Sequence, residues 1–364
     1  MYLSAISVPL PTYLSTYTNI MPAETSSSRA LNAILPLVAS GQPYEAHQKA
    51  RTFASRYSKS TQYDTAVDVL FQSARELLKS GQQGSGTDLT LFMLDVYENK
   101  GENVTDESRG RITQLIALTG SSGTWRKTII DRAVAWSAKY STCPAGDPGL
   151  RHYIGELLYK EGAFDAAEAH FLASGKRDSA RLLAQMMVDW SAVGGLPGNF
   201  ALRGTLPYLE NGNILAARTF IIQFVSKMIS SRPSLASSLQ NSPLPVTDSS
   251  DVIFTTDNVI NFCQLAVLTC QRAQGDKNKA MRECWLRLCG TYQSKGGILA
   301  SKEIRSVLFD IATLYFAIPP PRTQPDNPLG AMLSSMLGGG APGGVPQRRE
   351  LTPGLISPPA PGLD

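Results

Sequence analysis

The sequence predicts an all-α protein, an α-solenoid built from tetratricopeptide-like helix pairs. Between Tyr63 and Leu78 the apolar residues recur every three or four positions, which is the spacing of one face of a helix. The connections between helical segments are short, and a short connection makes neighbouring helices antiparallel. Almost no segment alternates apolar and polar residues as a half-buried strand does. A closed helical bundle is the competing architecture, and the chain length and many short connections favour the solenoid.

The helices follow one another along the chain with recognisable ends. Pro43 suits the first position of a helix, and "SKSTQ" joins that helix to the next, which Gly81 ends. We expect "GQQGSG" to be a loop, with Thr87 capping an apolar, central helix. Further helices are expected to begin near Asp106, Thr124, Asp147, the segment 161–175, Ser179, Asn199, Asn213, Asp257, Asp276 and Ser301.

Three small residues lie in register in segments that resemble one another. Ala66, Ala167 and Ala217 occupy equivalent places in "QYDTAVDVLF", "AFDAAEAHFL" and "GNILAARTFI". A small residue there lets two helices approach closely. The repeat is weak, as expected of a degenerate solenoid.

Two segments are not expected to belong to the helical core. Residues 230–251 are rich in Ser and Pro and read as a long loop, and "DVIFTT" (251–256) after it leaves room for one short β-hairpin. Residues 319–364 contain 11 prolines and 8 glycines, so this tail is expected to be disordered, apart from a short amphipathic patch at 327–338. Residues 1–30 are expected to be disordered or an upstream extension, with Met1 or Met21 as the functional start.

Composition argues against several classes of function. A net charge of +4 over 364 residues is too small to indicate nucleic-acid binding. No apolar run approaches the ~20 residues of a membrane span, so we expect no direct membrane insertion. The five cysteines lack metal-ligand spacing and are expected to be buried thiols in a reducing cytosol.

No catalytic constellation is recognisable. The histidines His47, His152 and His170 sit beside apolar residues and are expected to be hydrogen-bonded, partly buried side chains. The glycine-rich stretch at 81–86 lacks the Gly-Lys-Ser/Thr that places a lysine on phosphate. We therefore expect no enzyme activity, no catalytic residue, no metal and no cofactor.

Charge is patterned on the helix that begins at Pro43. Lys49, Arg56 and Lys59 fall on one stripe, whereas the following helices carry acids that include Asp88 and Asp95. A solvated face explains such a stripe on one helix. A basic face beside an acidic edge is also suited to docking a partner of mixed charge.

Several blocks of the sequence resemble one family. "SGQPYEAHQKARTFASRY", "GSGTDL" before "LDVYE", "GDPGLRHYIGELLYKEGAFDAAEAHFL" and "YFAIPPPRTQPDNPLGAMLSSMLGG" are similar to subunit four of the guided-entry pathway for tail-anchored membrane proteins. The resemblance covers residues 31–340 and weakens after Trp190. It implies a cytosolic, non-catalytic α-solenoid adaptor in the targeting of tail-anchored proteins to the endoplasmic reticulum.

The resemblance also implies partners and the halves that bind them. Residues 31–146 would bind the pathway's targeting ATPase, and residues 147–318 would bind a ubiquitin-like-domain partner that recruits a client-loaded co-chaperone. The family blocks and the charge pattern give the expected ATPase-binding residues: Tyr44, Glu45, His47, Gln48, Lys49, Arg51, Thr52, Arg56, Asp95 and Glu98. The expected contacts of the ubiquitin-like partner are the apolar residues Phe254, Leu265, Leu268, Leu308, Leu314 and Phe316. The alternative function is a tetratricopeptide-like chaperone receptor or a proteasome-lid-type scaffold subunit.

Overall fold

The structure is a computed structural model, and it describes residues 26–237 and 252–319. These ranges contain short 3₁₀ turns at Pro233–Leu235 (η1), Gly275–Lys277 (η3) and Gly297–Ala300 (η4). Their α-helices are α1 (Ser26–Ala39), α2 (Pro43–Lys59), α3 (Tyr63–Lys79), α4 (Gln83–Lys100), α5 (Asp106–Leu118), α6 (Trp125–Tyr140), α7 (Pro148–Lys160), α8 (Phe164–Ser174), α9 (Arg177–Val193), α10 (Pro197–Glu210), α11 (Ile214–Ser231), α12 (Asn258–Gln271), α13 (Lys279–Gln293) and α14 (Lys302–Phe316).

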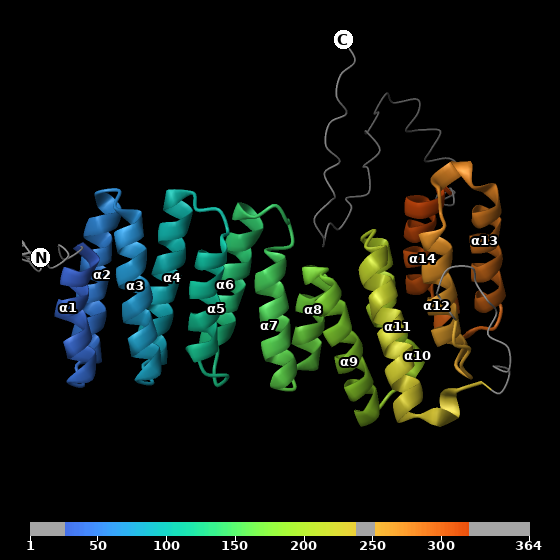
Figure 1. The fold of residues 1–364 in the computed structure, drawn as a ribbon, viewed down its shortest axis with the longest axis horizontal. Helices are drawn as coiled ribbons and strands as arrows, with labels where there is room; N and C mark the ends of the chain where they lie inside the picture. Colours follow the sequence, from blue (N-terminus) through green and yellow to red (C-terminus); the bar gives the residue numbers. More distant parts are fainter. Residues whose placement is uncertain (1–25, 238–251, 320–364) are drawn as a thin grey trace, which may run out of the picture.

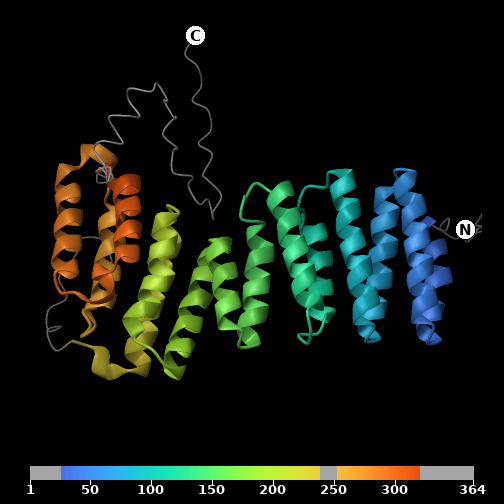
Figure 2. The same cartoon turned by 180° about the vertical axis from the view of Figure 1, so that it is seen from behind.

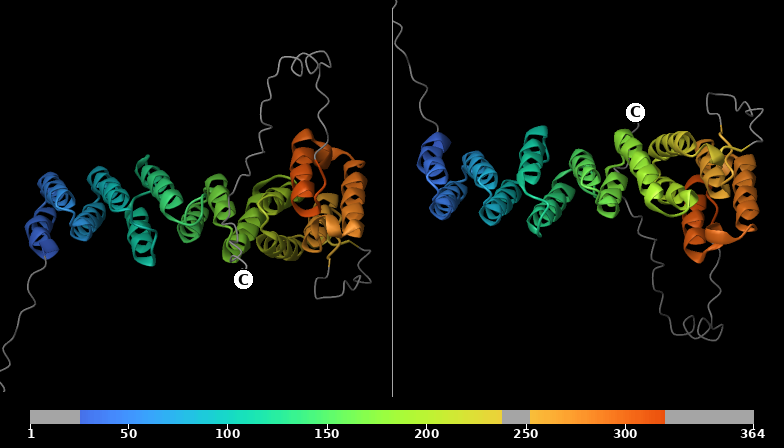
Figure 3. Two further views of the ribbon diagram at one scale, coloured as in Figure 1. Left: turned by 90° about the horizontal axis from the view of Figure 1, so that it is seen from above. Right: turned by 90° about the horizontal axis from the view of Figure 1, so that it is seen from below.

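The helices stand side by side along one long axis (Figures 1 and 2). Each helix from α1 to α12 packs against the next one or the next but one, so the helices form two staggered rows when seen end-on (Figure 3). At the far end α14 folds back against α10 and α13 and widens the rod into a compact end. The predicted all-α solenoid is confirmed, and the elongated form excludes a closed bundle.

Two hydrophobic cores divide the rod. The first is built by α1 to α7 and ends at Leu150 and Ile154, and the second begins at Ala167 of α8. The predicted boundary at residues 146/147 precedes α7, so the cores divide one helix later. The two cores meet where α7 packs on α8, because the partly buried Leu158 lies against both.

The same turn joins several of the helices. After α1, α3 and α10 a glycine takes a positive φ, and the amide of the next residue bonds back to a carbonyl five residues earlier: Gln42 to Leu37, Gln82 to Leu77, and Asn213 to Tyr208. After α2 the same place is taken by Thr61, with a φ of +59°. This repeated turn reverses the chain tightly and thereby keeps successive helices antiparallel.

The helical prediction needs two corrections in the first half. Helix α1 begins at Ser26, so the predicted boundary at residue 30 lies one turn inside it. The expected loop at 81–86 is mostly the first turn of α4, which begins at Gln83. Gly86 lies in that helix where α4 meets α3. A Cβ there would lie 2.5 Å from Leu78 Cγ, so only glycine allows the two helices to approach this closely. The three alanines expected at close helix contacts, Ala66, Ala167 and Ala217, are all fully buried.

The expected burial of the cysteines holds for three of the five. Cys143, Cys263 and Cys270 are buried as expected, but Cys284 is exposed and Cys289 is half-buried. Around the expected hairpin, the described residues contain an isolated antiparallel bridge between Ala236 and Thr255. The tail with its patch at 327–338, and the expected extension before Ser26, lie outside the described residues.

Helix α11 is long and apolar enough, by length and composition alone, to cross a membrane, with a mean hydropathy of 1.2 over 18 residues. Its position in the fold explains this composition. It packs between α9, α10 and α12, and it contributes Phe220, Phe224 and Met228 to the second core. The apolarity of α11 therefore reflects its place at the centre of the C-terminal half.

One half-buried histidine makes stability depend on pH. His170 in α8 accepts a hydrogen bond at Nδ1 from Arg151 Nη1, 3.2 Å away. Burial and the Arg151 charge lower the pKa of His170 to about 4, although Asp131 acts in the opposite direction. Below pH ~6.5 the unfolded chain binds a proton that the folded chain excludes, so stability falls as the pH falls. The loss attributable to His170 should reach on the order of 1–2 kcal/mol by pH 5.

We expect the substitution His170→Gln to reduce this pH dependence, because glutamine keeps a hydrogen-bond acceptor for Arg151 but does not titrate. Urea unfolding of the parent and the variant at pH 7.5 and pH 5 measures the difference. His47→Gln is the control, since it removes a histidine whose ring is bonded to a carboxylate instead. An unchanged loss of stability at pH 5 in His170→Gln would show that other groups cause it.

Candidate functional site

The expected ATPase-binding residues of α2 lie on one side of that helix. Ala46, Ala50 and Ala54 are fully buried and fix the opposite side against the neighbouring helices. Small side chains at these three places bring α2 close to its neighbours and leave its polar side to solvent. Tyr44 is 72% exposed. The other exposed members of the predicted set on this helix are Glu45, Gln48, Lys49, Thr52 and Arg56.

Asp88 of α4 organises two of the predicted residues. Its Oδ2 lies 2.8 Å from His47 Nε2 and also pairs with Arg51 Nη1. Partial burial raises the pKa of Asp88, but the hydrogen bonds from His47 and Arg51 outweigh burial and lower it. Arg51 also lies over the Phe92 ring, 5.3 Å from its centroid. The carboxylate stays ionised and holds both side chains at the junction of α2 and α4.

From sequence, Asp88 was expected on an acidic edge, and its pairing with α2 was not predicted. The available signal was a match of spacings: His47 and Arg51 are one helical turn apart, and so are Asp88 and Phe92. When α2 and α4 lie side by side, residues spaced in this way on one helix can contact residues with the same spacing on the other.

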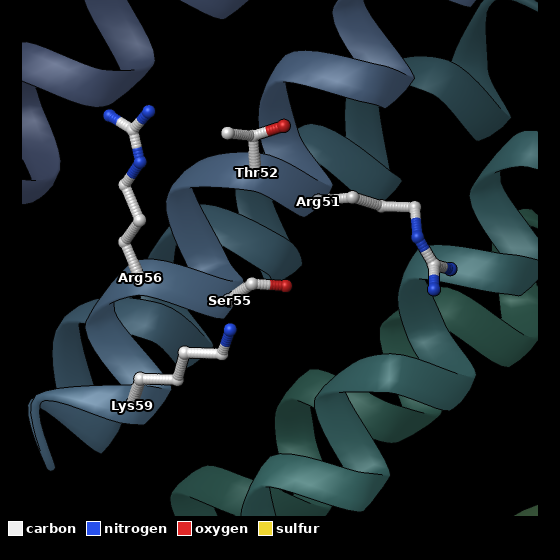
Figure 4. A pocket seen from close by; sticks show the side chains of 5 residues that line it. All are labelled: Arg51, Thr52, Ser55, Arg56 and Lys59. Carbon is white, nitrogen blue, oxygen red and sulfur yellow. The ribbon is translucent and has the colours of Figure 1, made fainter.

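A basic hollow opens on the exposed side of α2 (Figure 4). It has a volume of about 340 Å³ and is lined by Arg51, Thr52, Ser55, Arg56 and Lys59. Two hydroxyl groups therefore lie among three cationic side chains, and no carboxylate belongs to the lining. The hollow is open and comes from a single helix, so it suits a protruding acidic group of a protein partner better than an enclosed small molecule.

The predicted acidic residues of α4 are already paired within the chain. Arg132 of α6 reaches Asp95 Oδ1 and Glu98 Oε1, each at 2.8 Å. The hydrogen bond to Asp95 raises the pKa of Arg132, more than its partial burial lowers it. Arg132 was not predicted from sequence as part of this site. Asp95 and Glu98 therefore form a mixed-charge patch with Arg132, on the same row of helices as α2 (Figure 3).

A second candidate surface is an apolar hollow in the C-terminal half. It has a volume of about 200 Å³ and brings together three of the six residues expected to bind the ubiquitin-like partner: Phe254, Leu265 and Leu268. The remaining lining residues are Val252, Thr269, Arg272, Met281 and Cys284.

Side-chain amides hold one wall of this hollow in place. Gln264 bonds to both backbone polar groups of Ile253, and Asn261 does the same for Thr255. These bonds align the extended segment before α12 with that helix and leave Phe254 beside Leu265 and Leu268. A short strand-like segment thus completes the hollow without a sheet.

The other three expected contacts lie elsewhere. Phe316 is fully buried and stacks on Trp285 with ring centroids 5.1 Å apart, and Leu308 is 3% exposed. The prediction that both are surface contacts is corrected, because α14 folds back and turns this face into the core. Leu314 is 41% exposed, but it is not among the residues that line the hollow.

The chain is similar to several known proteins. The family model for Golgi to ER traffic protein 4 matches residues 60–337. Golgi to ER traffic protein 4 of Aspergillus fumigatus is 33% identical over 89% of this chain and 94% of its own length. The Schizosaccharomyces pombe protein of that name is 29% identical over 82% of this chain and 91% of its own. The human homolog is 26% identical over 83% of this chain and 84% of its own length.

A solved structure is similar over most of its length. The crystal structure of C. therm. Get4 superimposes with a TM-score of 0.74 at 32% identity, over 87% of this chain and 97% of that one.

Proposed function

Because this chain belongs to the Golgi to ER traffic protein 4 family, whose members act in the GET pathway, we propose that it is a cytosolic, non-catalytic adaptor of that pathway. In this proposal the chain binds the targeting ATPase through α2 and its neighbours. It binds a ubiquitin-like-domain partner through the C-terminal half. The partner in turn recruits the co-chaperone that carries the tail-anchored client.

The observation that carries the proposal is the separation of two unlike surfaces on one rod. The basic hollow and the His47–Asp88–Arg51 cluster lie on α2 and α4, whereas the apolar hollow lies on α12 and α13 at the opposite end (Figure 1). A charged surface favours a fast, salt-dependent contact, whereas an apolar hollow favours a persistent one. These properties suit an adaptor that keeps one partner bound and exchanges the other.

Charge supports the assignment of the ATPase to α2. Lys49, Arg56 and Lys59 are exposed, and Arg56 and Lys59 line the basic hollow together with Thr52 and Ser55. Asp95, Glu98 and Arg132 add a mixed-charge patch on the same row of helices. Two patches can fix the orientation of a docked protein and not only its affinity, so the second patch is proposed to influence nucleotide turnover by the ATPase.

Co-purification from cytosol followed by mass spectrometry tests the proposal. We expect the tagged full chain to recover an ATPase and a ubiquitin-like protein together. Recovery of a large chaperone, or of proteasome subunits, with neither of these proteins would favour the alternative of a chaperone receptor or scaffold subunit.

A further inference from the structure

The apolar hollow of the C-terminal half has the size and lining of a side-chain receptor. Its volume of about 200 Å³ is below the ~300–1,000 Å³ typical of small-molecule sites. Phe254, Leu265, Leu268 and Met281 make its walls apolar, and Met281 adds a side chain that adapts to different shapes. The occupant that fits is a peptide that inserts a few aliphatic or Met side chains.

The chain carries such a peptide beyond its described residues. Leu329, Met332, Leu333, Met336 and Leu337 are spaced as one face of a helix. The match to the family model runs to residue 337, well past the last helix of the described part. Asp326, shortly before this segment, is opposite in charge to Arg272 at the hollow.

The segment is also close enough to reach the hollow. Phe316 stacks on Trp285, the residue after Cys284 of the hollow, and the described chain ends at Pro319. About ten residues separate Pro319 from Leu329, and extended they span up to ~33–36 Å. That length exceeds the ~10–12 Å width of a helix, so the chain can pass around α13.

We propose that residues 329–337 of this chain occupy the apolar hollow between the Val252–Phe254 segment, α12 and α13. The occupied hollow is closed to other apolar segments until the tail is displaced. On the proposed function, the ubiquitin-like partner binds the same hollow, so residues 329–337 compete with that partner. Without the partner, these residues keep the hollow covered.

A natural reporter lies in the hollow. Cys284 is exposed and belongs to the lining, whereas Cys143, Cys263 and Cys270 are buried. Burial also raises the pKa of the Cys289 thiol to about 12, which suppresses its reactive thiolate. The rate of labelling by a thiol-specific reagent on the native full chain therefore reports mainly on Cys284, and Cys284→Ser identifies its contribution.

The test compares the full chain with the double variant Met332→Asp and Met336→Asp. If the tail covers the hollow about nine-tenths of the time, the variant should label about tenfold faster. Ser334→Asp with Ser335→Asp adds the same charge to the opposite face of the segment and should label like the parent. A synthetic peptide of residues 325–340 should restore slow labelling to the Met variant.

Equal labelling rates in the parent and the Met variant would overturn the proposal. Protection that increases with protein concentration would also overturn it, because the tail of a second copy would then be the occupant. A fragment of the ubiquitin-like partner, added to the Met variant, separates this inference from the proposed function. Protection by the fragment but not by the tail refutes only the inference, and protection by the tail but not by the fragment refutes only the proposed partner site.

Discussion

Replacing Lys49 and Arg56 together with glutamate is expected to weaken binding of the targeting ATPase by on the order of tenfold or more at low salt. Both side chains are exposed on the side of α2 away from Ala46, Ala50 and Ala54. One exposed ion pair is worth only ~0–1 kcal/mol, but each reversal removes an attraction and adds a repulsion. Charges in one patch also act together on the association rate.

Calorimetric titration at two ionic strengths measures this effect. The parent should lose affinity as salt rises, and the variant should show a weaker salt dependence because fewer attractive contacts remain to be screened. Lys176→Glu with Arg177→Glu is the matched control, since it changes the net charge equally at the start of α9. Circular dichroism checks the fold. Parental affinity of the α2 variant at low salt would mean that this side of α2 is only a solvated face.

A weaker effect is expected for Asp95. Arg132 already neutralises part of its charge, and it also binds Glu98. Reversal to lysine would place a cation against Arg132, so Asp95→Asn is the cleaner substitution. Its expected effect is on nucleotide turnover by the bound ATPase more than on affinity.

Replacing Gly204 with alanine is expected to destabilise the C-terminal half by about 2–3 kcal/mol. A Cβ on Gly204 would fall inside normal contact distance of three ring carbons of Phe220. Phe220 is fully buried and stacks on Phe224, with centroids 5.6 Å apart, so the ring has little room to move. For a domain of this size the melting temperature should fall by about 2–4 °C per kcal/mol.

Gly290 supplies the control in the same half. It lies in α13, is exposed, and a Cβ there would have no neighbour within 4 Å. Gly290→Ala should raise stability by ~0.5–1 kcal/mol, because alanine favours the helix. Adding Phe220→Leu to Gly204→Ala should recover part of the loss, so the two effects should not add. Similar melting temperatures for Gly204→Ala and Gly290→Ala would contradict the close packing of α10 on α11.

Local sequence signals predicted most helices and the polar side of α2. The steps of three and four from Tyr63 belong to α3, and Pro43 is the first residue of α2. Local signals failed at Gly86, where a glycine typical of loops serves a close contact between helices. Nothing nearby in the sequence indicates that contact, since it depends on the position of Leu78.

Long-range packing explains what the sequence did not predict in the two sites. Asp88 pairs with residues about forty positions away, because solenoid packing sets the register of α2 on α4. The apolar residues of α14 indicate that one face of this helix is buried. They do not indicate whether a partner or the chain itself covers that face. Trp285 and α10 cover Phe316 and its neighbours, whereas Phe254, Leu265 and Leu268 keep an open hollow.

A two-ended adaptor must hold two different partners on one rod at the same time. Sedimentation velocity of the purified full chain with the targeting ATPase and the ubiquitin-like partner tests it most directly. We expect one species whose mass is that of all three components. Lys49→Glu with Arg56→Glu should remove only the ATPase, and Leu268→Asp should remove only the ubiquitin-like partner. Mutually exclusive binding, or loss of both partners from either variant, would contradict the two-ended adaptor.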